Sequence, residues 1–225
     1  VLKIAPRALP SPFAVAGELV THADIILEDM GITATNALIG LAAGAIVAIV
    51  AAGLAATFRP IDGMLAPLVA AIAVVPIVAI TPILNTMFGA SSQFGRQSIA
   101  ALAAFVPVFI NVVRGLRQTR PVHRDLLRAS GASGSQTFRF LTLPTALPYL
   151  VTGLRVASSL AVIAALVAEY FGGPADGIGT AIAGYAKSGK AALAFAYVVG
   201  GVAIGLAFFL VTLLLEWLVT RRRPT

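Results

Sequence analysis

Few side chains in this sequence have the types and spacing that enzyme chemistry needs. The chain has no cysteine, which excludes a thiolate nucleophile and a disulfide framework. Its two histidines, His22 and His123, are far apart in the sequence and fall in segments expected at the surface. Residues 184–190, GYAKSGK, have the spacing of a phosphate-binding loop, but that loop needs Ser or Thr at position 191, where this chain has Ala. We therefore expect no catalytic residue, cofactor or metal in this chain.

Two charged side chains, Arg155 and Glu169, interrupt an otherwise apolar stretch. On a helix they would be about 21 Å apart at about 1.5 Å per residue, which is too far for an ion pair. A turn of about 100° per residue places them within about 40° of the same face. Charges in such stretches face a protein interior or water, or they snorkel to a polar boundary. We favour the interior for Glu169 and leave both alternatives open for Arg155.

The elements that position these residues are membrane helices. Hydrophobic residues make up 59% of the 225 residues and charged residues 11%, against about 25% charged in soluble domains. A spanning helix needs about 20 mostly apolar residues. None of the apolar segments alternates like a strand of a membrane barrel, so we expect an all-α polytopic membrane protein. The five predicted spans are 32–57, 63–88, 95–114, 144–171 and 191–219.

Lysines and arginines divide unequally between the two sides that five spans define. The side with the 115–143 loop and the C-terminus has ten, and the other side has five. Because Lys and Arg accumulate on cytoplasmic loops, we predict that the 115–143 loop is cytoplasmic and the 172–190 loop is extracytoplasmic. This sorting accounts for the net charge of +7 without nucleic acid binding. The ten are Arg59, Arg114, Arg117, Arg120, Arg124, Arg128, Arg139, Arg221, Arg222 and Arg223; the five are Lys3, Arg7, Arg96, Lys187 and Lys190.

The N-terminal segment, residues 1–31, is then extracytoplasmic. Residues 12–30 place apolar and acidic side chains on opposite faces, so we expect one amphipathic helix on the membrane surface. An extracytoplasmic N-terminus also indicates a further span before Val1. Within the spans, Gly40-x-x-x-Gly44 and Gly201-x-x-x-Gly205 predict faces of close helix contact.

The 115–143 loop has the most specific local pattern. Pro121 suits a helix start, and Gly131 stands where a glycine ends a helix. Ser133 and Gln136 fit a capping box that opens a second short helix. Pro144 then begins the next span. A capped helix pair with solvated arginines is the simplest interpretation of these features.

The spacing of this loop resembles the EAA loop of ABC-importer permeases, which reads Glu-Ala-Ala, three residues, Gly, nine residues, an aliphatic residue, one residue and Leu-Pro. The matching positions here are Asp125-Leu126-Leu127, Gly131, Leu141 and Leu143-Pro144, with Asp for Glu and Leu-Leu for Ala-Ala. Other stretches resemble the nitrate/sulfonate/taurine branch of these permeases, among them Leu9-Pro10-Ser11-Pro12, Gly153-Leu154-Arg155 and Gly177-Ile178-Gly179. In that branch the Leu-Pro-Ser-Pro stretch follows a first transmembrane helix.

The resemblance implies a type I ABC importer permease fold in the bacterial cytoplasmic membrane. It implies a translocation subunit that pairs with a second permease subunit, identical or different, on two ATP-binding subunits that bind ATP and Mg²⁺. An extracytoplasmic solute-binding protein would deliver a sulfonate, nitrate, taurine or a pyrimidine- or vitamin-like solute. Lys187 and Lys190 are either solvated loop charges or contacts of this binding protein. The family's coupling helix, which docks in the ATPase, corresponds here to a segment that includes Asp125, Leu126, Leu127, Arg128, Gly131, Ala132 and Ser133.

The translocation path is expected at the second span. Pro76 and Pro82 lack N–H donors and should kink or break it, and freed carbonyls are tolerated at membrane depth only beside protein or a watery cavity. The polar candidates for the path or its gate are Thr81, Asn85, Asn111, Arg155 and Glu169.

Two other classes fit the sequence less well. An ion-coupled secondary transporter commonly shows inverted repeats and several buried carboxylates, whereas only Glu169 is clearly inside a predicted span. An intramembrane hydrolase needs a Ser/His or Asp/Asp set at membrane depth, and none is present among the predicted spans.

Overall fold

The computed structural model describes residues 9–89 and 92–221. The predicted boundary charges Lys3, Arg7, Arg222 and Arg223 therefore lie outside the described residues. All regular elements within the described ranges are helical, as predicted. In chain order they are α1 (Pro12–Thr21), α2 (Ala23–Thr57), α3 (Arg59–Ala73), α4 (Ile77–Phe88), α5 (Phe94–Arg117), α6 (Pro121–Ala129), α7 (Gly134–Thr137), the π-helical η1 (Phe138–Thr142), α8 (Leu143–Tyr170), α9 (Ile178–Lys187) and α10 (Ala191–Arg221).

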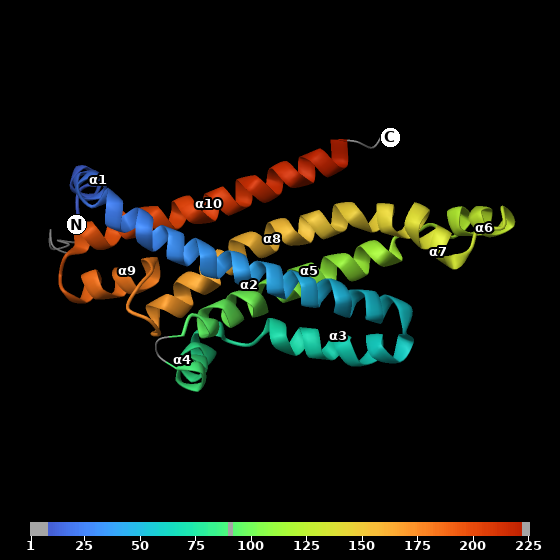
Figure 1. The fold of residues 1–225 in the computed structure, drawn as a ribbon, viewed down its shortest axis with the longest axis horizontal. Coiled ribbons are helices and arrows are strands. Elements are labelled where there is room, and N and C mark those ends of the chain that lie inside the picture. Colours follow the sequence, from blue (N-terminus) through green and yellow to red (C-terminus); the bar gives the residue numbers. More distant parts are fainter. Residues whose placement is uncertain (1–8, 90–91, 222–225) are drawn as a thin grey trace, which may run out of the picture.

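Four helices, α2, α5, α8 and α10, are long and apolar enough to cross a membrane by themselves, α8 as the end of a longer helix. They run along the long axis of the molecule, with α5 packed on both α2 and α8 and with α10 packed on α8 (Figure 1). Small buried side chains such as Ala48, Ala104 and Ala161 fill the core between them. This small-residue core brings the helices close together, as in other membrane bundles.

The predicted close contact of α2 is confirmed at both of its glycines. At Gly40 an added Cβ would overlap the Cβ of Ala100, and at Gly44 it would overlap the carbonyl group of Ala101. Without side chains at these two positions, α2 reaches the backbone of α5 directly. The helix contact at the glycine pair of α10 is less close. The nearest atom to an added Cβ is 3.3 Å away at Gly201 and 4.0 Å away at Gly205.

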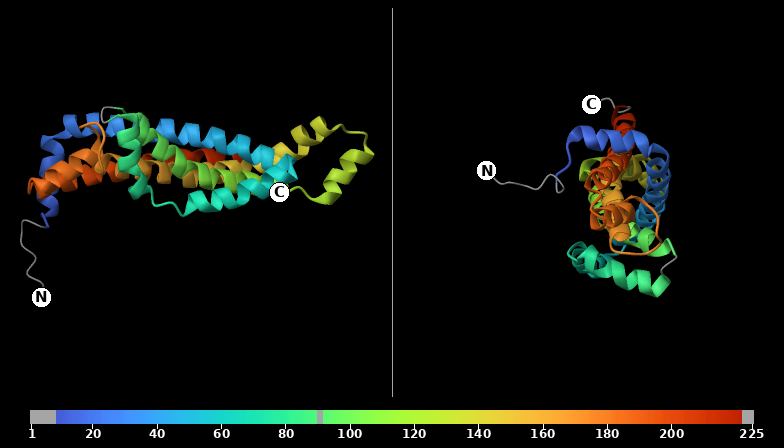
Figure 2. Two further views of the ribbon diagram at one scale, coloured as in Figure 1. Left: turned by 90° about the horizontal axis from the view of Figure 1, so that it is seen from below. Right: turned by 90° about the vertical axis from the view of Figure 1, so that its left-hand side faces the viewer.

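The second predicted span is broken, as its prolines indicate. α3 ends at Ala73, α4 begins at Ile77, and the two helices meet at 96°. The break falls at Pro76, which has no N–H to continue α3 and adopts an extended ψ of 100°. Pro82 lies inside α4 without interrupting it. α4 consequently lies across the bundle rather than along it (Figure 2).

The expectation of one surface helix over residues 12–30 is wrong. α1 ends at Thr21 and α2 begins at Ala23, so the first long helix starts before the predicted boundary at residue 32. The physical reason is that Ile26, which is 2% exposed, packs beside Gly200 of α10. The first turns of α2 therefore belong to the bundle. Of the predicted surface helix, only the part that forms α1 lies across the bundle.

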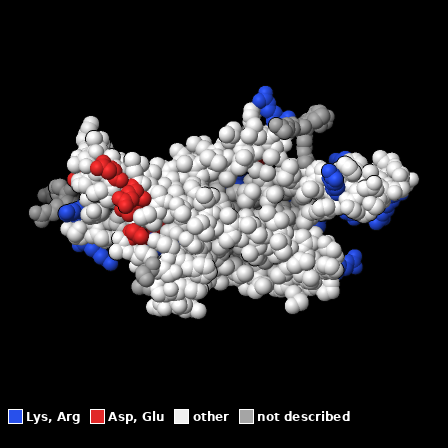
Figure 3. Space-filling model, in the orientation of Figure 1, with Lys and Arg blue, Asp and Glu red and all other residues white. Residues whose placement is uncertain are grey.

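The two ends of the bundle differ in charge (Figure 3). We call the end with α1, α9 and the first turns of α2 the acidic end, because it carries Asp24, Glu28 and Asp29. We call the opposite end, from which α6 projects, the basic end. The arginines of the basic end are Arg59, Arg114, Arg117, Arg120, Arg124, Arg128 and Arg139.

Candidate functional sites

The helix α6 projects beyond the basic end of the bundle (Figures 1 and 2). Its apolar side chains do not enter the core, because Val122 is 73% exposed and Leu126 is 64% exposed. Asp125 and Arg128 border this apolar surface, with 3.9 Å between Asp Oδ1 and Arg Nη1. An exposed apolar ridge on a short helix, bordered by charges, is suited to docking in a groove of another protein.

A glycine ends α6 as predicted. Gly131 adopts a φ of 76°, and its N–H donates to the carbonyl oxygen of Arg128 at 3.0 Å. The N–H of Ala132 donates to the carbonyl oxygen of Leu127 at 2.9 Å. This pair of hydrogen bonds is a Schellman ending, which favours glycine because side chains rarely tolerate a positive φ.

The predicted capping box is present at the start of α7. Ser133 Oγ accepts a hydrogen bond from the N–H of Gln136 at 3.2 Å, and the N–H of Ser133 donates to Gln136 Oε1 at 2.7 Å. α7 then continues through η1 into α8, so that Gly134–Tyr170 is one helix of 37 residues. Only a short turn separates α6 from this long helix.

α8 begins within one residue of the predicted span start at Pro144, but it continues a helix that starts at Gly134. The helix passes this position because η1 is a π-helical turn, in which the N–H of Leu143 donates to the carbonyl oxygen of Phe138. The wider turn places the proline, which has no N–H, among the first residues of α8. A displacement of α6 would therefore act directly on a helix that runs through the bundle.

At the acidic end, Glu169 is buried with 1% exposure. Its Oε2 accepts hydrogen bonds from Thr33 Oγ1 of α2 and from the N–H of Gly179 of α9, each at 2.9 Å. Space for the carboxylate comes from Gly177, where an added Cβ would lie 2.7 Å from Oε2. One oxygen of Glu169 thus joins three helices.

Side chains of other helices cap the start of α9. Gly177 precedes α9 with a φ of 85° and offers no side-chain cap of its own. Its N–H donates to Asp29 Oδ1 at 2.8 Å, and the N–H of Ile178 donates to Thr33 Oγ1 at 3.0 Å. The next N–H, that of Gly179, donates to Glu169. These three contacts satisfy donors that a helix start leaves free. The predicted 172–190 loop is therefore a folded segment fixed to α2 and α8.

Arg96 of α5, which is fully buried, is a residue whose role sequence reasoning missed. Its Nη1 lies 2.6 Å from Asp176 Oδ1 and 3.1 Å from Gln93 Oε1. Its Nη2 donates to the carbonyl oxygen of Pro174 at 2.6 Å and to Thr180 Oγ1 at 3.1 Å. We had counted Arg96 as a boundary charge, whereas it holds the segment between α8 and α9.

Arg155 faces α10 and does not lie beside Glu169. Its Nη1 is 3.0 Å from Glu216 Oε2, and the hydroxyl of Thr152 donates to Glu216 Oε1 at 2.6 Å. The side chains of Arg155 and Glu216 are 32% and 17% exposed. Glu216 of α10 therefore pairs with a cation within the bundle.

The remaining path candidates lie near the broken span. Thr81 and Asn85 are buried on α4, and the hydroxyl of Thr81 donates to the carbonyl oxygen of Ile77 at 2.9 Å. Asn111 of α5 donates to the carbonyl oxygen of Pro107 at 2.8 Å. Asn111 also borders a cavity of about 450 Å³ that opens at the break, beside Val75 and Ile77. The five candidates are therefore spread over three places: the broken span, the α8–α10 contact and the acidic end.

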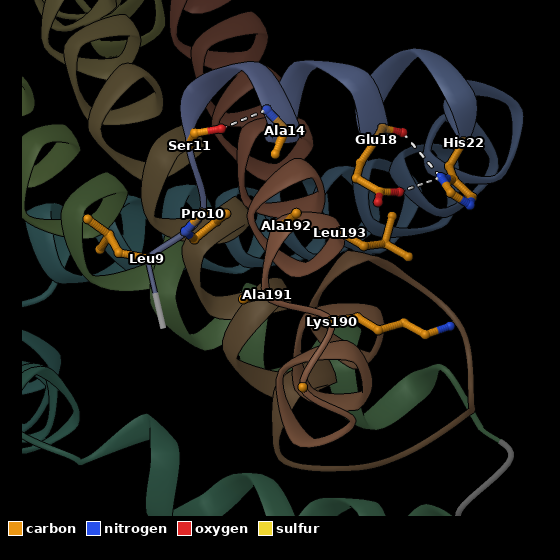
Figure 4. A pocket seen from close by; sticks show the side chains of 11 residues that line it. Leu9, Pro10, Ser11, Ala14, Glu18, His22, Lys190, Ala191, Ala192 and Leu193 are labelled. Carbon is orange, nitrogen blue, oxygen red and sulfur yellow. Dashed lines mark hydrogen bonds and ion pairs between the residues drawn. The ribbon is translucent and has the colours of Figure 1, made fainter. Parts of the chain in front are cut away.

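A larger cavity, of about 750 Å³, lies at the acidic end between α1 and the start of α10. Figure 4 shows Glu18 and His22 on one side of it and Lys190 on the other. His22 Nδ1 lies 3.0 Å from Glu18 Oε2. Lys190, from the motif that resembled a phosphate loop, thus lines a surface hollow next to α1.

Known proteins match most of this chain. Residues 25–224 match the family described as "Binding-protein-dependent transport system inner membrane component". A probable ABC transporter permease protein of Haemophilus influenzae is 32% identical over 173 residues, which are 76% of this chain and 69% of that protein. A formylaminopyrimidine transport permease protein of Halalkalibacterium halodurans is 30% identical over 168 residues, which are 74% of this chain and 67% of that protein.

A solved structure shares the fold. The crystal structure of an amino acid ABC transporter with histidines superposes with a TM-score of 0.66 at 16% sequence identity. The match covers 90% of this chain and 94% of that chain. The arrangement of helices described above is therefore a fold known from an ABC transporter.

Proposed function

This chain belongs to the family of binding-protein-dependent transport system inner membrane components, a family of multi-pass inner membrane proteins, and from that premise we propose that it forms the solute path of an ABC importer. The path runs along the broken span α3–α4 and the facing part of α5. A separate ATPase subunit drives it by moving the coupling segment, residues 121–144. The chain itself performs no catalysis, and the partner ATPase binds ATP and Mg²⁺.

The observation that carries this proposal is the way in which α6 is joined to α8. α6 presents exposed Leu126 and Val122 outside the bundle, and the helix that follows its Schellman turn continues without a break to Tyr170. A membrane bundle needs such an element to sense ATP, because the nucleotide is bound in another subunit. Force applied to α6 reaches α8 and, through Glu169 and Thr180, the start of α9.

The partners follow from the family. A second permease subunit, identical or different, completes the path, and two ATP-binding subunits dock at the basic end, which is cytoplasmic. An extracytoplasmic solute-binding protein docks at the acidic end, where Lys187 and Lys190 are exposed. The solute is a small organic or inorganic molecule such as a sulfonate, nitrate, taurine or a pyrimidine- or vitamin-like compound, and the name of the Halalkalibacterium halodurans relative supports the last class.

The experiment that tests this function uses Leu126. Leu126→Asp places a charge on the apolar ridge of α6, so it should abolish co-purification with the ATP-binding subunit or uncouple ATP hydrolysis from uptake in reconstituted vesicles. Leu126→Met keeps an apolar side chain of similar size and should retain more than about half of the coupled activity. Wild-type uptake by Leu126→Asp would show that α6 is not the coupling element.

A further inference from the structure

The crossing helix α4 is attached to the bundle through few buried side chains. It packs on α5 and α8, and its fully buried residues are Thr81 and Asn85. Ile77 and Leu84 pack, partly buried, against a small core cluster of Ile99, Ala164 and Ala168. The other face of α4 points outward, with Val78 46%, Ile83 57% and Met87 69% exposed. The break at Pro76 leaves α4 without a helical continuation of α3. α4 is therefore a separate element, positioned by the apolar contacts of Ile77 and Leu84 and by what Asn85 contacts.

Asn85 occupies a socket whose walls are glycines. A Cβ added at Gly95, in the first turn of α5, would lie 2.7 Å from Asn85 Oδ1. Added Cβ atoms at Gly172 and Gly173 would lie 3.4 Å and 3.6 Å from Asn85 Nδ2. Both of these latter glycines have positive φ angles, 134° and 103°. We call these three glycines the glycine socket. A side chain at Gly95 would overlap the amide, whereas added Cβ atoms at the other two would lie in van der Waals contact with it.

The amide fits this socket in shape but not in hydrogen bonding. Among residues 9–89 and 92–221, neither Asn85 Oδ1 nor Asn85 Nδ2 has a hydrogen-bond partner, although both atoms are buried. Arg96 Nε, which is also buried and without a partner, lies 3.2 Å from the position of an added Gly173 Cβ. A buried amide that makes no hydrogen bond costs free energy compared with the same amide in water. The docked position of α4 is thus held by packing and opposed by the desolvation of Asn85.

We propose that Asn85 is a releasable latch of the translocation path. Its amide holds α4 in the glycine socket in the conformation described here and leaves the socket when α4 swings about the break at Val74–Pro76 during transport. An apolar side chain would hold α4 in the socket more stably. The unsatisfied amide instead keeps the docked and the released positions of α4 close in free energy. The proposal rests on the proposed function, because it assigns Asn85 a positioning role in solute transport.

A disulfide tests the movement directly. The chain has no cysteine, so Asn85→Cys with Gly95→Cys introduces a single pair. An added Cβ at Gly95 lies 3.6 Å from the backbone nitrogen of Asn85, which is compatible with the short Cβ–Cβ distance of a disulfide. In the purified complex with its ATPase subunits, the pair should cross-link without nucleotide, and its yield should fall at least about threefold when the complex is trapped with MgATP and vanadate. The single-cysteine variants are the matched controls.

Two results overturn the latch. One is a cross-linking yield that does not change between the nucleotide-free and the trapped complex. The other is unchanged uptake by the fully cross-linked protein, compared with the same sample after reduction. Either result counts only if the complex assembles and hydrolyses ATP; a complex that does not assemble contradicts the proposed function and not the latch.

A second variant tests the energetics. Asn85→Leu removes the unsatisfied amide and keeps four side-chain heavy atoms branched at Cγ, so it should raise the thermal midpoint of the complex by about 2–4 °C and lower the maximal uptake rate about tenfold, which corresponds to about 1.4 kcal/mol. Thr86→Val, which removes an exposed hydroxyl one residue away on α4, should change neither. A merely structural Asn85 would lose stability and uptake together, and a solute-binding Asn85 would raise KM at unchanged maximal rate; both outcomes contradict the latch.

Discussion

At the scale of single residues, Glu169 has the most consequential position. Its Oε2 accepts from α2 and α9, and its carbonyl oxygen accepts from Thr180 of α9 at 3.1 Å. A carboxylate at the end of a spanning helix is costly unless such donors surround it. We propose that Glu169 acts indirectly in transport, because it positions the start of α9.

Substitution of Glu169 distinguishes a role in positioning α9 from a purely structural contribution of the buried side chain. Glu169→Ala leaves the Thr33 hydroxyl and the Gly179 N–H without their acceptor, which should destabilise the protein by about 1–3 kcal/mol for each unsatisfied group. Glu169→Gln keeps an acceptor oxygen and should retain assembly and basal ATP hydrolysis while lowering uptake by a smaller factor than the alanine variant. Thermal unfolding and uptake in vesicles measure both effects. Wild-type transport by both variants would contradict any gating role for Glu169.

The ion pair between Arg155 and Glu216 could not be predicted from spacing within one helix. The positions of Arg155 and Glu169 on one helix indicated a shared face, but nothing local pointed to Glu216 on another helix. Arg96 was missed for a related reason, since it stands near a predicted span boundary. Its spacing of three and four residues from the apolar Ile99 and Ala100 was the available signal for a buried face.

At the scale of elements, the coupling segment was largely predictable because its signals are local. A proline start, a glycine end and a Ser-x-x-Gln box act within a few residues, and α6 and α7 form where these signals stand. The break of the second span was predictable from Pro76 in the same way. α9 was not, because a short glycine-containing segment became a helix whose caps are Asp29, Thr33 and Glu169, far away in the sequence.

The end of α6 gives a prediction at this scale. Gly131→Val puts a β-branched side chain at a φ of 76°, which should cost about 1–2 kcal/mol and lengthen or disorder the end of α6. Gly131→Asn is the matched control, because asparagine tolerates this conformation better. The valine variant should still insert but should hydrolyse more ATP per solute imported than the asparagine variant. Equal ratios in both variants would show that the Schellman turn does not matter for coupling.

At the scale of the whole molecule, charge is segregated along the bundle axis. Arg59 of α3, Arg114 and Arg117 of α5 and the arginines of α6 lie at the basic end, and Asp24, Glu28 and Asp29 lie at the other (Figure 3). Because lysines and arginines mark the cytoplasmic side, this arrangement supports the proposal that α6 faces the ATPase and α9 faces the solute-binding protein. The orientation and the coupling role therefore depend on one another.

Labelling of single cysteines measures this orientation. Ser133→Cys, between α6 and α7, and Ser188→Cys, after α9, are both at exposed positions. In right-side-out vesicles an impermeant maleimide should react with the cysteine at position 188 alone, and in inverted vesicles with the cysteine at position 133 alone. Reaction of both cysteines from the same side would contradict the predicted topology.

A site-specific photo-cross-link at Leu126 tests directly whether α6 docks on the ATP-binding subunit. A photoreactive residue there, in the assembled transporter, should capture the ATP-binding subunit, because α6 docks on that subunit with its exposed apolar ridge. The same residue at Val20 of α1, which is 80% exposed at the acidic end, should not capture it. Capture of the ATP-binding subunit from Val20, or no capture from Leu126 in a complex that hydrolyses ATP, would contradict the account.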